Sequence, residues 1–236
     1  DLVRSRGLGD VYKRQHDFLE NLSTCKSPQQ MFGALAKSYY AEKAGIDPKS
    51  IFVVSVMPCT AKKYECEREE MCVDELRDVD AVITTRELAK MIRQSGEHFT
   101  ELEDGKFDSM MGVGSGAAVI FGNTGGVMEA ALRTVADVLT GEDLPKLEYQ
   151  PVRGLEGIRE AVVNVAGTDV KVAIATGTGN AGALLEKIRA GEADYHFIEV
   201  MACPGGCING GGQPIIMDKE KTEETKQKRM RSIYDM

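Results

Sequence analysis

The stretch FIEVMACPGGCINGGGQP, residues 197–214, carries the strongest structural signal in the sequence. An apolar run that begins at Tyr195 predicts a β-strand, and this strand ends in Cys203. Five glycines lie between and after Cys203 and Cys207. Thiolates bind iron–sulfur clusters, and glycine lets the backbone come close enough to wrap one. The stretch therefore predicts a metal–sulfur site at the end of a strand, and a tight glycine-rich loop with two buried thiols is the alternative.

A second predicted strand also ends in a cysteine. The β-branched run IFVVSV, residues 51–56, is typical of a buried parallel strand and leads through Met57 and Pro58 to Cys59. Ligands of open α/β sheets gather at the carboxyl ends of strands, so the two cysteine groups are expected to meet at one site. Structural zinc usually has cysteines two residues apart, which the three-residue gap of the first group does not match.

A lysine follows the second cysteine group. Lys62 stands three residues after Cys59 and comes close to it if the chain turns into a helix there. Its ammonium would then lower the pKa of the thiol or neutralise an anionic ligand. An ordinary surface lysine is the alternative.

The rest of the chain alternates strand and helix signals. Ser27 and Pro28 predict a helix start that closes at Gly45, and Thr84 with Glu87 predicts a capping box. Further segments predict a strand at 81–84, helices at 127–139 and 181–191, a hairpin over 160–176, and a solvated helix after Asp218. This alternation predicts an α/β architecture with a mostly parallel sheet.

Composition excludes two classes of protein. The 236 residues carry a net charge of −8 with no dominant Lys/Arg cluster, which argues against a nucleic-acid binder. No apolar run approaches the ~20 residues of a membrane helix. Six cysteines without a signal peptide predict reduced thiols in a cytoplasmic setting, where grouped cysteines bind metal more often than they form disulfides.

Five segments resemble the iron-only (FeFe) hydrogenases. VMPCTAKKYE and FIEVMACPGGCINGGGQP are similar to the second and third signature motifs of that family, and SPQQMFGALAKSYY, DAVITTRELAKMIR and IFGNTGGVMEAALR are similar to other segments of it. The resemblance runs from about His16 to the end. It implies an α/β fold with two lobes of mostly parallel sheet flanked by helices, the metal site between them, and a lobe boundary near 125–150.

The resemblance also implies the cofactor and its residues. It implies a 4Fe-4S cubane joined through a cysteine to a two-iron unit that carries CO, cyanide and azadithiolate. Cys59 and Cys203 would bind the cubane, Cys207 would bridge the two parts, and Lys62 would hydrogen-bond a cyanide. Ser23 matches a proton-relay serine, with an ordinary turn serine as the alternative. The remaining pocket residues implied are Ser27, Pro28, Gln29, Met57, Pro58, Phe121, Gly122 and Met201.

The chain departs from the family in what it lacks. The first signature, with a fourth cluster cysteine and a proton-shuttling cysteine, is absent, as are ferredoxin-like cysteine groups. Residues 16–236 are therefore expected to form a partial catalytic domain that is inactive alone, and residues 1–15 a non-native or disordered tail. The implied partners are ferredoxin or a NAD(P)-linked electron-transfer subunit, and maturation proteins. Cys25, Cys66 and Cys72 match no ligand position, although zinc bound by Cys66 and Cys72 with Cys59 is a rival account.

Two other functions compete with the hydrogenase interpretation. Gly177, Gly179 and Gly182 match a dinucleotide-binding fingerprint, with Glu199 near the place of the ribose-binding acid. A tight strand-to-helix turn explains the same glycines. The second rival is a non-catalytic relative, either a hydrogenase-like sensor or an iron–sulfur assembly protein. Such relatives tend to lose pocket residues, whereas Lys62 and both pocket methionines are present here.

Overall fold

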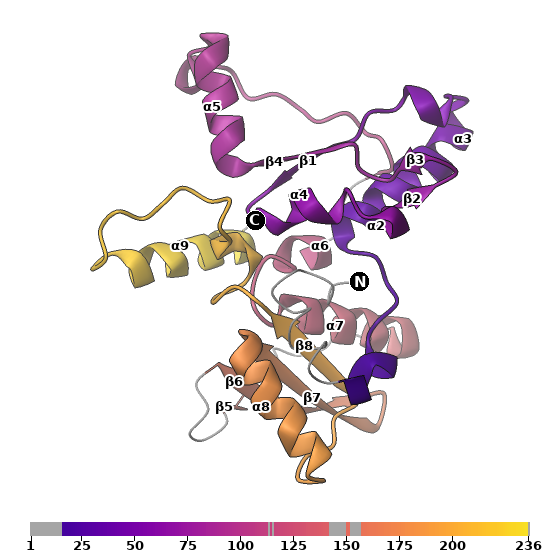
Figure 1. Ribbon diagram of the computed structural model, residues 1–236, viewed down its shortest axis with the longest axis vertical. Coiled ribbons are helices and arrows are strands. Elements are labelled where there is room, and N and C mark those ends of the chain that lie inside the picture. Colours follow the sequence, from indigo (N-terminus) through magenta and orange to yellow (C-terminus); the bar gives the residue numbers. More distant parts are fainter. Residues whose placement is uncertain (1–15, 113, 115, 142–149, 152–156, 236) are drawn as a thin grey trace. The chain divides into compact units, whose positions relative to one another are not determined.

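The computed structural model describes residues 16–112, 114, 116–141, 150–151 and 157–235 (Figure 1). These form two compact units: unit 1 comprises residues 21–114 and 210–215, and unit 2 the remainder. Helices and strands alternate in both, which confirms the predicted α/β class. The predicted tail, residues 1–15, lies outside the described residues, and the predicted lobe boundary stays a prediction.

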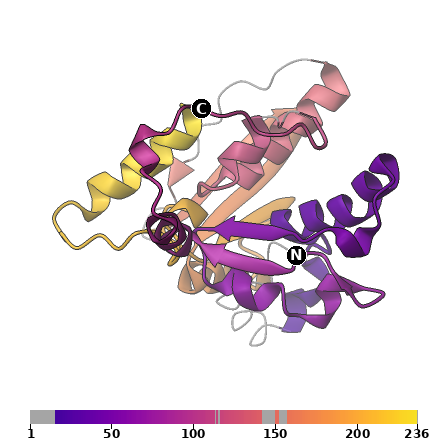
Figure 2. The same cartoon turned by 90° about the horizontal axis from the view of Figure 1, so that it is seen from above.

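Unit 1 is built on a short parallel sheet. Strand β1 (Val54–Met57) pairs with β4 (Ala81–Thr84), and the two arrows lie side by side in Figure 2. A hairpin of β2 (Cys72–Val73) and β3 (Leu76–Arg77) stands apart from this sheet. The helical elements are α2 (Pro28–Leu35), the π-helix η2 (Ala36–Tyr40), α3 (Ala41–Ala44), η3 (Pro48–Ser50), α4 (Ala61–Glu65), η4 (Glu69–Met71), α5 (Thr85–Ser95) and η5 (Phe99–Glu101).

The predicted strand at 51–56 is parallel as expected, but its predicted burial is wrong. Val54 is 49% exposed and Val56 44%, while only Ser55 between them is buried. Parallel strands are normally covered on both faces, and β-branched runs are typical of them for that reason. In the described part of the chain, β1 has one strand neighbour, and two of its three apolar side chains, Val54 and Val56, meet solvent.

Helix starts in unit 1 follow their predicted signals in part. The capping box of Thr84 and Glu87 at the start of α5 is confirmed. Pro28 opens α2 and Gly45 ends the helical run at φ +65°, as predicted. Ser27 occupies the N-cap position, but its side chain makes no capping bond. The buried face of α2 is polar, with Gln30 fully buried, whereas the apolar residue Phe32 is half exposed.

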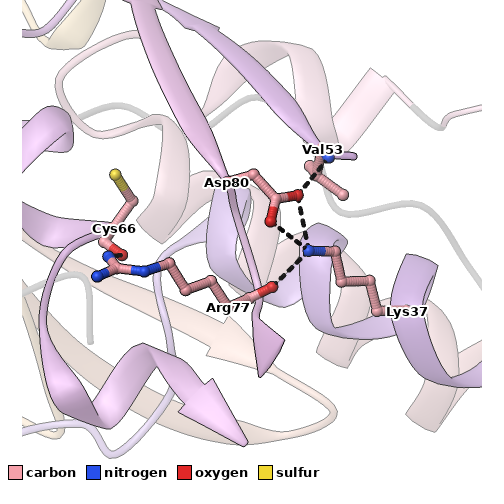
Figure 3. A network of polar contacts seen from close by, with 5 residues as sticks. All are labelled: Lys37, Val53, Cys66, Arg77 and Asp80. Carbon is pink, nitrogen blue, oxygen red and sulfur yellow. Dashed lines mark hydrogen bonds and ion pairs between the residues drawn. The ribbon is translucent and has the colours of Figure 1, made fainter. Parts of the chain in front are cut away.

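A buried ion pair ties this helical run to the sheet (Figure 3). Lys37 Nζ, in η2, lies 2.6 and 2.7 Å from the two carboxylate oxygens of Asp80 and donates to the carbonyl of Arg77 at 2.7 Å. Asp80 also accepts the backbone N–H of Val53, just before β1. The side chain of Lys37 is 4% exposed. Unit 1 is thus held by this buried ion pair as well as by its apolar cluster of Cys66, Val79 and Val82.

Unit 2 has a four-stranded sheet in the order β5-β6-β7-β8. The predicted hairpin is confirmed as β6 (Ile158–Val165) and β7 (Thr168–Thr176), which are antiparallel, and β8 (Phe197–Met201) runs parallel to β7. The other elements are η1 (His16–Asn21), α6 (Gly116–Ile120), α7 (Gly126–Thr140), β5 (Gln150–Pro151), α8 (Thr178–Arg189), η6 (Cys207–Asn209) and α9 (Thr222–Tyr234).

Both faces of this sheet are covered, by α7 on one side and α8 on the other (Figure 1). Met128 and Leu132 of α7 pack against Ile174, while Leu184 of α8 packs against Ala173, one position along the same strand. Side chains of a strand alternate between faces, so the two clusters are separate cores. No helix of the described residues has the length and apolar character to cross a membrane.

Candidate metal centre

Two cysteines stand in equivalent positions at the ends of parallel strands. β1 ends at Met57 and Cys59 follows two residues later, while β8 ends at Met201 and Cys203 follows two residues later. Both thiols are partly exposed. The cysteines therefore stand beyond the carboxyl ends of their strands, as the sequence predicts. Cys59 lies in unit 1 and the Cys203–Cys207 loop in unit 2.

Residues 210–215, which we call the strap, support the turn that carries Cys59. Gly212 donates its N–H to the carbonyl of Pro58 at 2.8 Å, and its own carbonyl accepts the N–H of Arg86 at 3.2 Å. A Cβ on Gly212 would stand 2.7 Å from the carbonyl carbon of Pro58 and 2.8 Å from both the nitrogen of Cys59 and the oxygen of Met57. Only glycine fits there. Part of the triple-glycine run, predicted to wrap a cluster, thus packs on the Cys59 turn.

Three predicted pocket residues converge on one carboxylate, Glu65. Lys62 Nζ lies 2.7 Å from Oε1 of Glu65, and Ser27 Oγ and Gln29 Nε2 each donate to Oε2 at 2.7 Å. Glu65 is 3% exposed and the Lys62 side chain 17%, so Lys62 is not an ordinary surface lysine. Sequence reasoning missed Glu65. Its spacing of three residues from Lys62 along α4 was the available signal.

This cluster leaves hydrogen-bonding capacity for a bound group. The Oε1 atom of Gln29 is buried without a partner among the described residues, and so are both amide atoms of Gln30. An ammonium has three N–H donors, and the ion pair to Glu65 uses one of those on Lys62. Buried polar atoms are normally satisfied, by water or a ligand where protein groups do not reach. The unused donors and acceptors of these side chains fit a bound group that is polar.

In unit 2 the cysteine loop lies on the turn formed by residues 121–125. Ile208 donates its N–H to the carbonyl of Gly122 at 2.9 Å, and Thr124 donates to the carbonyl of Gly205 at 3.4 Å. Gly206 adopts φ +101°, and a Cβ there would stand 2.4 Å from the Gly122 oxygen. The structure thus places the predicted pocket residue Gly122 against the predicted ligand loop, with Phe121 as its chain neighbour.

Glu199 has a structural role that sequence reasoning did not anticipate. Its Oε1 accepts the N–H of Gly125 at 2.6 Å and its Oε2 that of Met128 at 2.8 Å, at the start of α7. It is 6% exposed, and burial raises the pKa of its carboxyl despite these N–H bonds. Gly177 takes φ +85° and donates to the carbonyl of Met201. Because Glu199 is bonded to α7 and Gly177 makes a strand-to-helix turn, the dinucleotide interpretation loses its acidic residue.

The remaining predicted residues lie in ordinary surroundings. Ser23 Oγ accepts the N–H of Cys25, as a turn serine does, and Pro28 is exposed. Cys66 is buried, donates to the carbonyl of Lys63, and has a thiol pKa raised by burial. Within each unit, the described residues bring no three His, Cys, Asp or Glu side chains together to hold an ion. The rival zinc site built on Cys59, Cys66 and Cys72, all in unit 1, therefore has no support.

Known proteins are similar to this chain in sequence and in fold. The family described as "Iron only hydrogenase large subunit, C-terminal domain" matches residues 10–211. The periplasmic Fe hydrogenase large subunit of Nitratidesulfovibrio vulgaris is 54% identical over 200 residues, which cover 85% of this chain and 48% of that protein. Cytosolic iron-sulfur assembly component 3 of Mus musculus is 35% identical over 223 residues, or 92% of this chain and 46% of that protein.

Solved structures show the same relationship. A structure of the FeFe-hydrogenase from Chlamydomonas reinhardtii aligns with a TM-score of 0.77 at 44% identity, covering 93% of this chain and 61% of that one. The chain spans about half the length, or less, of the curated relatives that it matches.

Proposed function

The chain belongs to the family of iron-only hydrogenase large subunits, and from that premise we propose that its parent protein reversibly reduces protons to dihydrogen. The observation that carries the proposal is the buried cluster around Glu65. Three residues that the resemblance assigns to a hydrogenase pocket, Ser27, Gln29 and Lys62, converge there. A protein that had lost the chemistry would have no need to keep a lysine ion pair and an orphaned amide oxygen buried together.

The proposed cofactor is the 4Fe-4S cubane with a two-iron unit carrying CO, cyanide and azadithiolate. When bound, it supplies the redox chemistry of proton reduction, and the protein supplies ligation, orientation and electrostatics. Cys59 and Cys203 would hold the cubane and Cys207 would bridge the two parts. A fourth cysteine ligand would come from a part of the parent protein outside this chain.

The polar residues of unit 1 would bind and orient the cofactor. Glu65 fixes the Lys62 ammonium, whose other N–H donors would reach a cyanide in a charge-assisted hydrogen bond. Ser27 and Gln29 fix Glu65 in turn. Pro58 and the pocket residues Met57, Met201, Phe121 and Gly122 would exclude water around the two-iron unit. Ser23 remains the proposed proton relay, a role that its exposed position near the solvent allows.

A second candidate function is iron–sulfur assembly, because one group of relatives carries that name at about a third identity. The hydrogenase relatives are more than half identical to this chain, which favours catalysis over assembly.

The names of the relatives also bear on the partners. One hydrogenase relative is named as an NADP-reducing hydrogenase subunit, and this supports an electron-transfer subunit or ferredoxin as partner. Maturation proteins would install the two-iron unit. A cytoplasmic location is part of the proposal, although another relative is periplasmic.

Reconstitution with iron and sulfide tests the ligand assignment. We expect Cys59→Ser and Cys203→Ser to lower bound iron sharply, and Cys207→Ser to prevent attachment of a synthetic two-iron unit. Cys66→Ser and Cys72→Ser are matched controls that should leave iron content unchanged. If a control loses as much iron as Cys203→Ser, the ligand set is wrong.

Hydrogen evolution tests the function itself. The parent protein, matured with the two-iron unit, should evolve hydrogen from a reduced dye, whereas the 236-residue chain alone should bind iron substoichiometrically and evolve none. A matured parent that binds the full cofactor without turnover would favour the assembly or sensor function.

A further inference from the structure

Among the described residues of unit 2, Glu199 is the most buried titratable group that the proposed function leaves unused. It lies on β8 opposite Ile174, on the face that α7 covers. A carboxylate on this apolar face is costly unless it is hydrogen-bonded. Its two oxygens take the N–H groups of Gly125 and Met128, so the cost is offset by bonds that tie β8 to the start of α7.

The helix that Glu199 bonds has no capping side chain of its own. α7 begins after Gly125, a glycine at φ +89°. The first N–H groups of a helix lack intrahelical partners and are usually satisfied by a Ser, Thr, Asp or Asn at the N-cap. Here Glu199 supplies that acceptor from 74 positions further along the chain. The favourable interaction of a carboxylate with the positive end of the helix dipole adds to these bonds.

The turn just before α7 is the surface on which the cysteine loop rests. Gly122 accepts the N–H of Ile208, and Thr124 donates to Gly205. The close approach of Gly206 to the same turn leaves no room for a Cβ. Residues 121–125 therefore contact the Cys203–Cys207 loop, and the last of them, Gly125, donates its N–H to the carboxylate of Glu199.

These contacts close a ring. The ring runs from Glu199 through Gly125 and the turn to Ile208, back along the cysteine loop to Cys203, and down β8 to Glu199. Within it, the side chain of Glu199 links the strand bearing Cys203 to the start of α7, while Arg159 of β6 donates to the carbonyl of Thr124 in the same turn at 3.1 Å. Removing the Glu199 carboxylate opens this ring without touching a cysteine.

We propose that Glu199 is a positioning residue, which fixes the Cys203–Cys207 loop in place by holding the turn of residues 121–125. The functional consequence rests on the proposed function: a fixed loop would present its thiolates to a cluster at the required spacing. The geometric part, a loop held through Glu199, belongs to this chain whether or not metal binds.

Amide hydrogen exchange on the 236-residue chain without iron tests the geometric part. In Glu199→Gln, whose side chain has the same shape but one acceptor oxygen, the N–H groups of Ile208 and Thr124 should exchange about tenfold faster or more. Amides in the β6–β7 hairpin should keep their wild-type rates. Ile174→Val is the matched control: it alters the same face, opposite Glu199, and should leave Ile208 as protected as in wild type.

Thiol reactivity gives a second readout. In Glu199→Gln, Cys203 and Cys207 should react with iodoacetamide several-fold faster relative to Cys25, an exposed thiol in unit 1 that serves as internal reference. Glu199→Asp should not restore the wild-type values, because a carboxylate shorter by one methylene cannot reach both Gly125 and Met128. If only the amides of residues 127–128 exchange faster while Ile208 and both loop thiols are unchanged, Glu199 merely caps α7 and the proposal is overturned.

Iron loading separates this proposal from the proposed function. Wild-type chain that binds no iron under any reconstitution would count against the hydrogenase cofactor, while the exchange result at Ile208 would stand. If wild type binds iron and Glu199→Gln shows the loosened loop, its iron should have altered Mössbauer parameters or lower occupancy. An identical iron spectrum and occupancy in the two proteins would overturn the positioning role.

Discussion

The strands that carry Cys59 and Cys203 begin from the same pattern, Val-Met-x-Cys, but the two units support them differently. β8 is part of a four-stranded sheet with an apolar core on each face, and its Met201 is 7% exposed. β1 has one partner strand, and Val54 and Val56 face solvent. The same local structure, a parallel strand followed by a cysteine, is thus stabilised in two ways.

Unit 1 adds buried ion pairs to a small apolar cluster of Cys66, Val79 and Val82, whereas unit 2 has a larger apolar cluster on each face of its sheet. Lys37 with Asp80 and Lys62 with Glu65 are ion pairs with at least one member almost fully buried. Among the described residues of unit 2, the buried charged group is Glu199, which is set among apolar side chains. Unit 2 should therefore be sensitive to cavities, and unit 1 to the loss of a charge.

The largest effect should come from a cavity in unit 2. Leu184→Ala removes a side chain that is 0% exposed between α8 and the sheet. We expect the free energy of unfolding to fall by about 4 kcal/mol, measured by urea denaturation. Val54→Ala on the half-exposed strand of unit 1 should cost less than about 1 kcal/mol. Equal losses at the two positions would remove the contrast between the units.

The second effect is the loss of a buried charge in unit 1. Lys37→Met leaves Asp80 without its cation and should cost about 3 kcal/mol, toward the low end for a broken buried pair because Asp80 keeps the N–H of Val53. The exposed Lys43, which lies over the ring of Tyr39, provides the control: Lys43→Met should have little effect. If the double variant Lys37→Met/Asp80→Leu is as unstable as the single one, the uncompensated charge is not the cause.

The pH dependence of stability should have opposite signs in the two units, with smaller effects. Burial raises the pKa of Glu199, so its contribution to stability falls as pH rises from its unfolded value near ~4.3 through the folded pKa. Hydrogen bonds from Lys63 and Thr84 lower the pKa of Glu87 to about 2, so its contribution is present above ~4.3 and lost as pH falls toward that value.

Urea denaturation across this pH range measures both contributions as differences from wild type. Glu199→Gln should gain on wild type as pH rises above ~4.3, whereas Glu87→Gln should lose its disadvantage as pH falls below it. Parallel curves for wild type and Glu199→Gln would show that its carboxyl titrates normally.

The smallest effect concerns the two hairpin turns. The β2–β3 turn of unit 1 places Asp74 at φ +49° and Glu75 at φ +65°, whereas the β6–β7 turn of unit 2 uses Ala166 and Gly167. Left-handed backbone favours glycine, so Glu75→Gly should raise stability by about 1 kcal/mol. Gly167→Ala should lower it by a similar amount. A loss of stability in Glu75→Gly would mean that its side chain makes a contact that outweighs the strain.

Local signals in the sequence were sufficient where the interaction is local. The capping box of Thr84 and Glu87 and the turn near Gly167 depend on residues a few positions apart, and both were predicted. The strand ends at Cys59 and Cys203 were also predicted, because an apolar run that is followed by a segment with proline or glycine indicates a strand that ends there.

Non-local contacts explain what the sequence did not reveal. Ser27 looked like a helix cap, but its hydroxyl bonds Glu65, 38 residues away. Glu199 looked like a ribose ligand, but it bonds backbone N–H groups of α7. The burial of Val54 and Val56 depends on how many strands and helices surround β1, which periodicity in one segment cannot report.

The strap of Gly212 has a consequence for folding while the chain is being synthesised. Gly212 bonds both Pro58 and Arg86, but it is made 154 positions after Pro58 and 126 after Arg86. On a ribosome that adds roughly 5–20 residues per second, the Cys59 turn lacks its strap for roughly 8–30 s. A cofactor bound at Cys59 would therefore gain the support of this strap only after Gly212 has been synthesised.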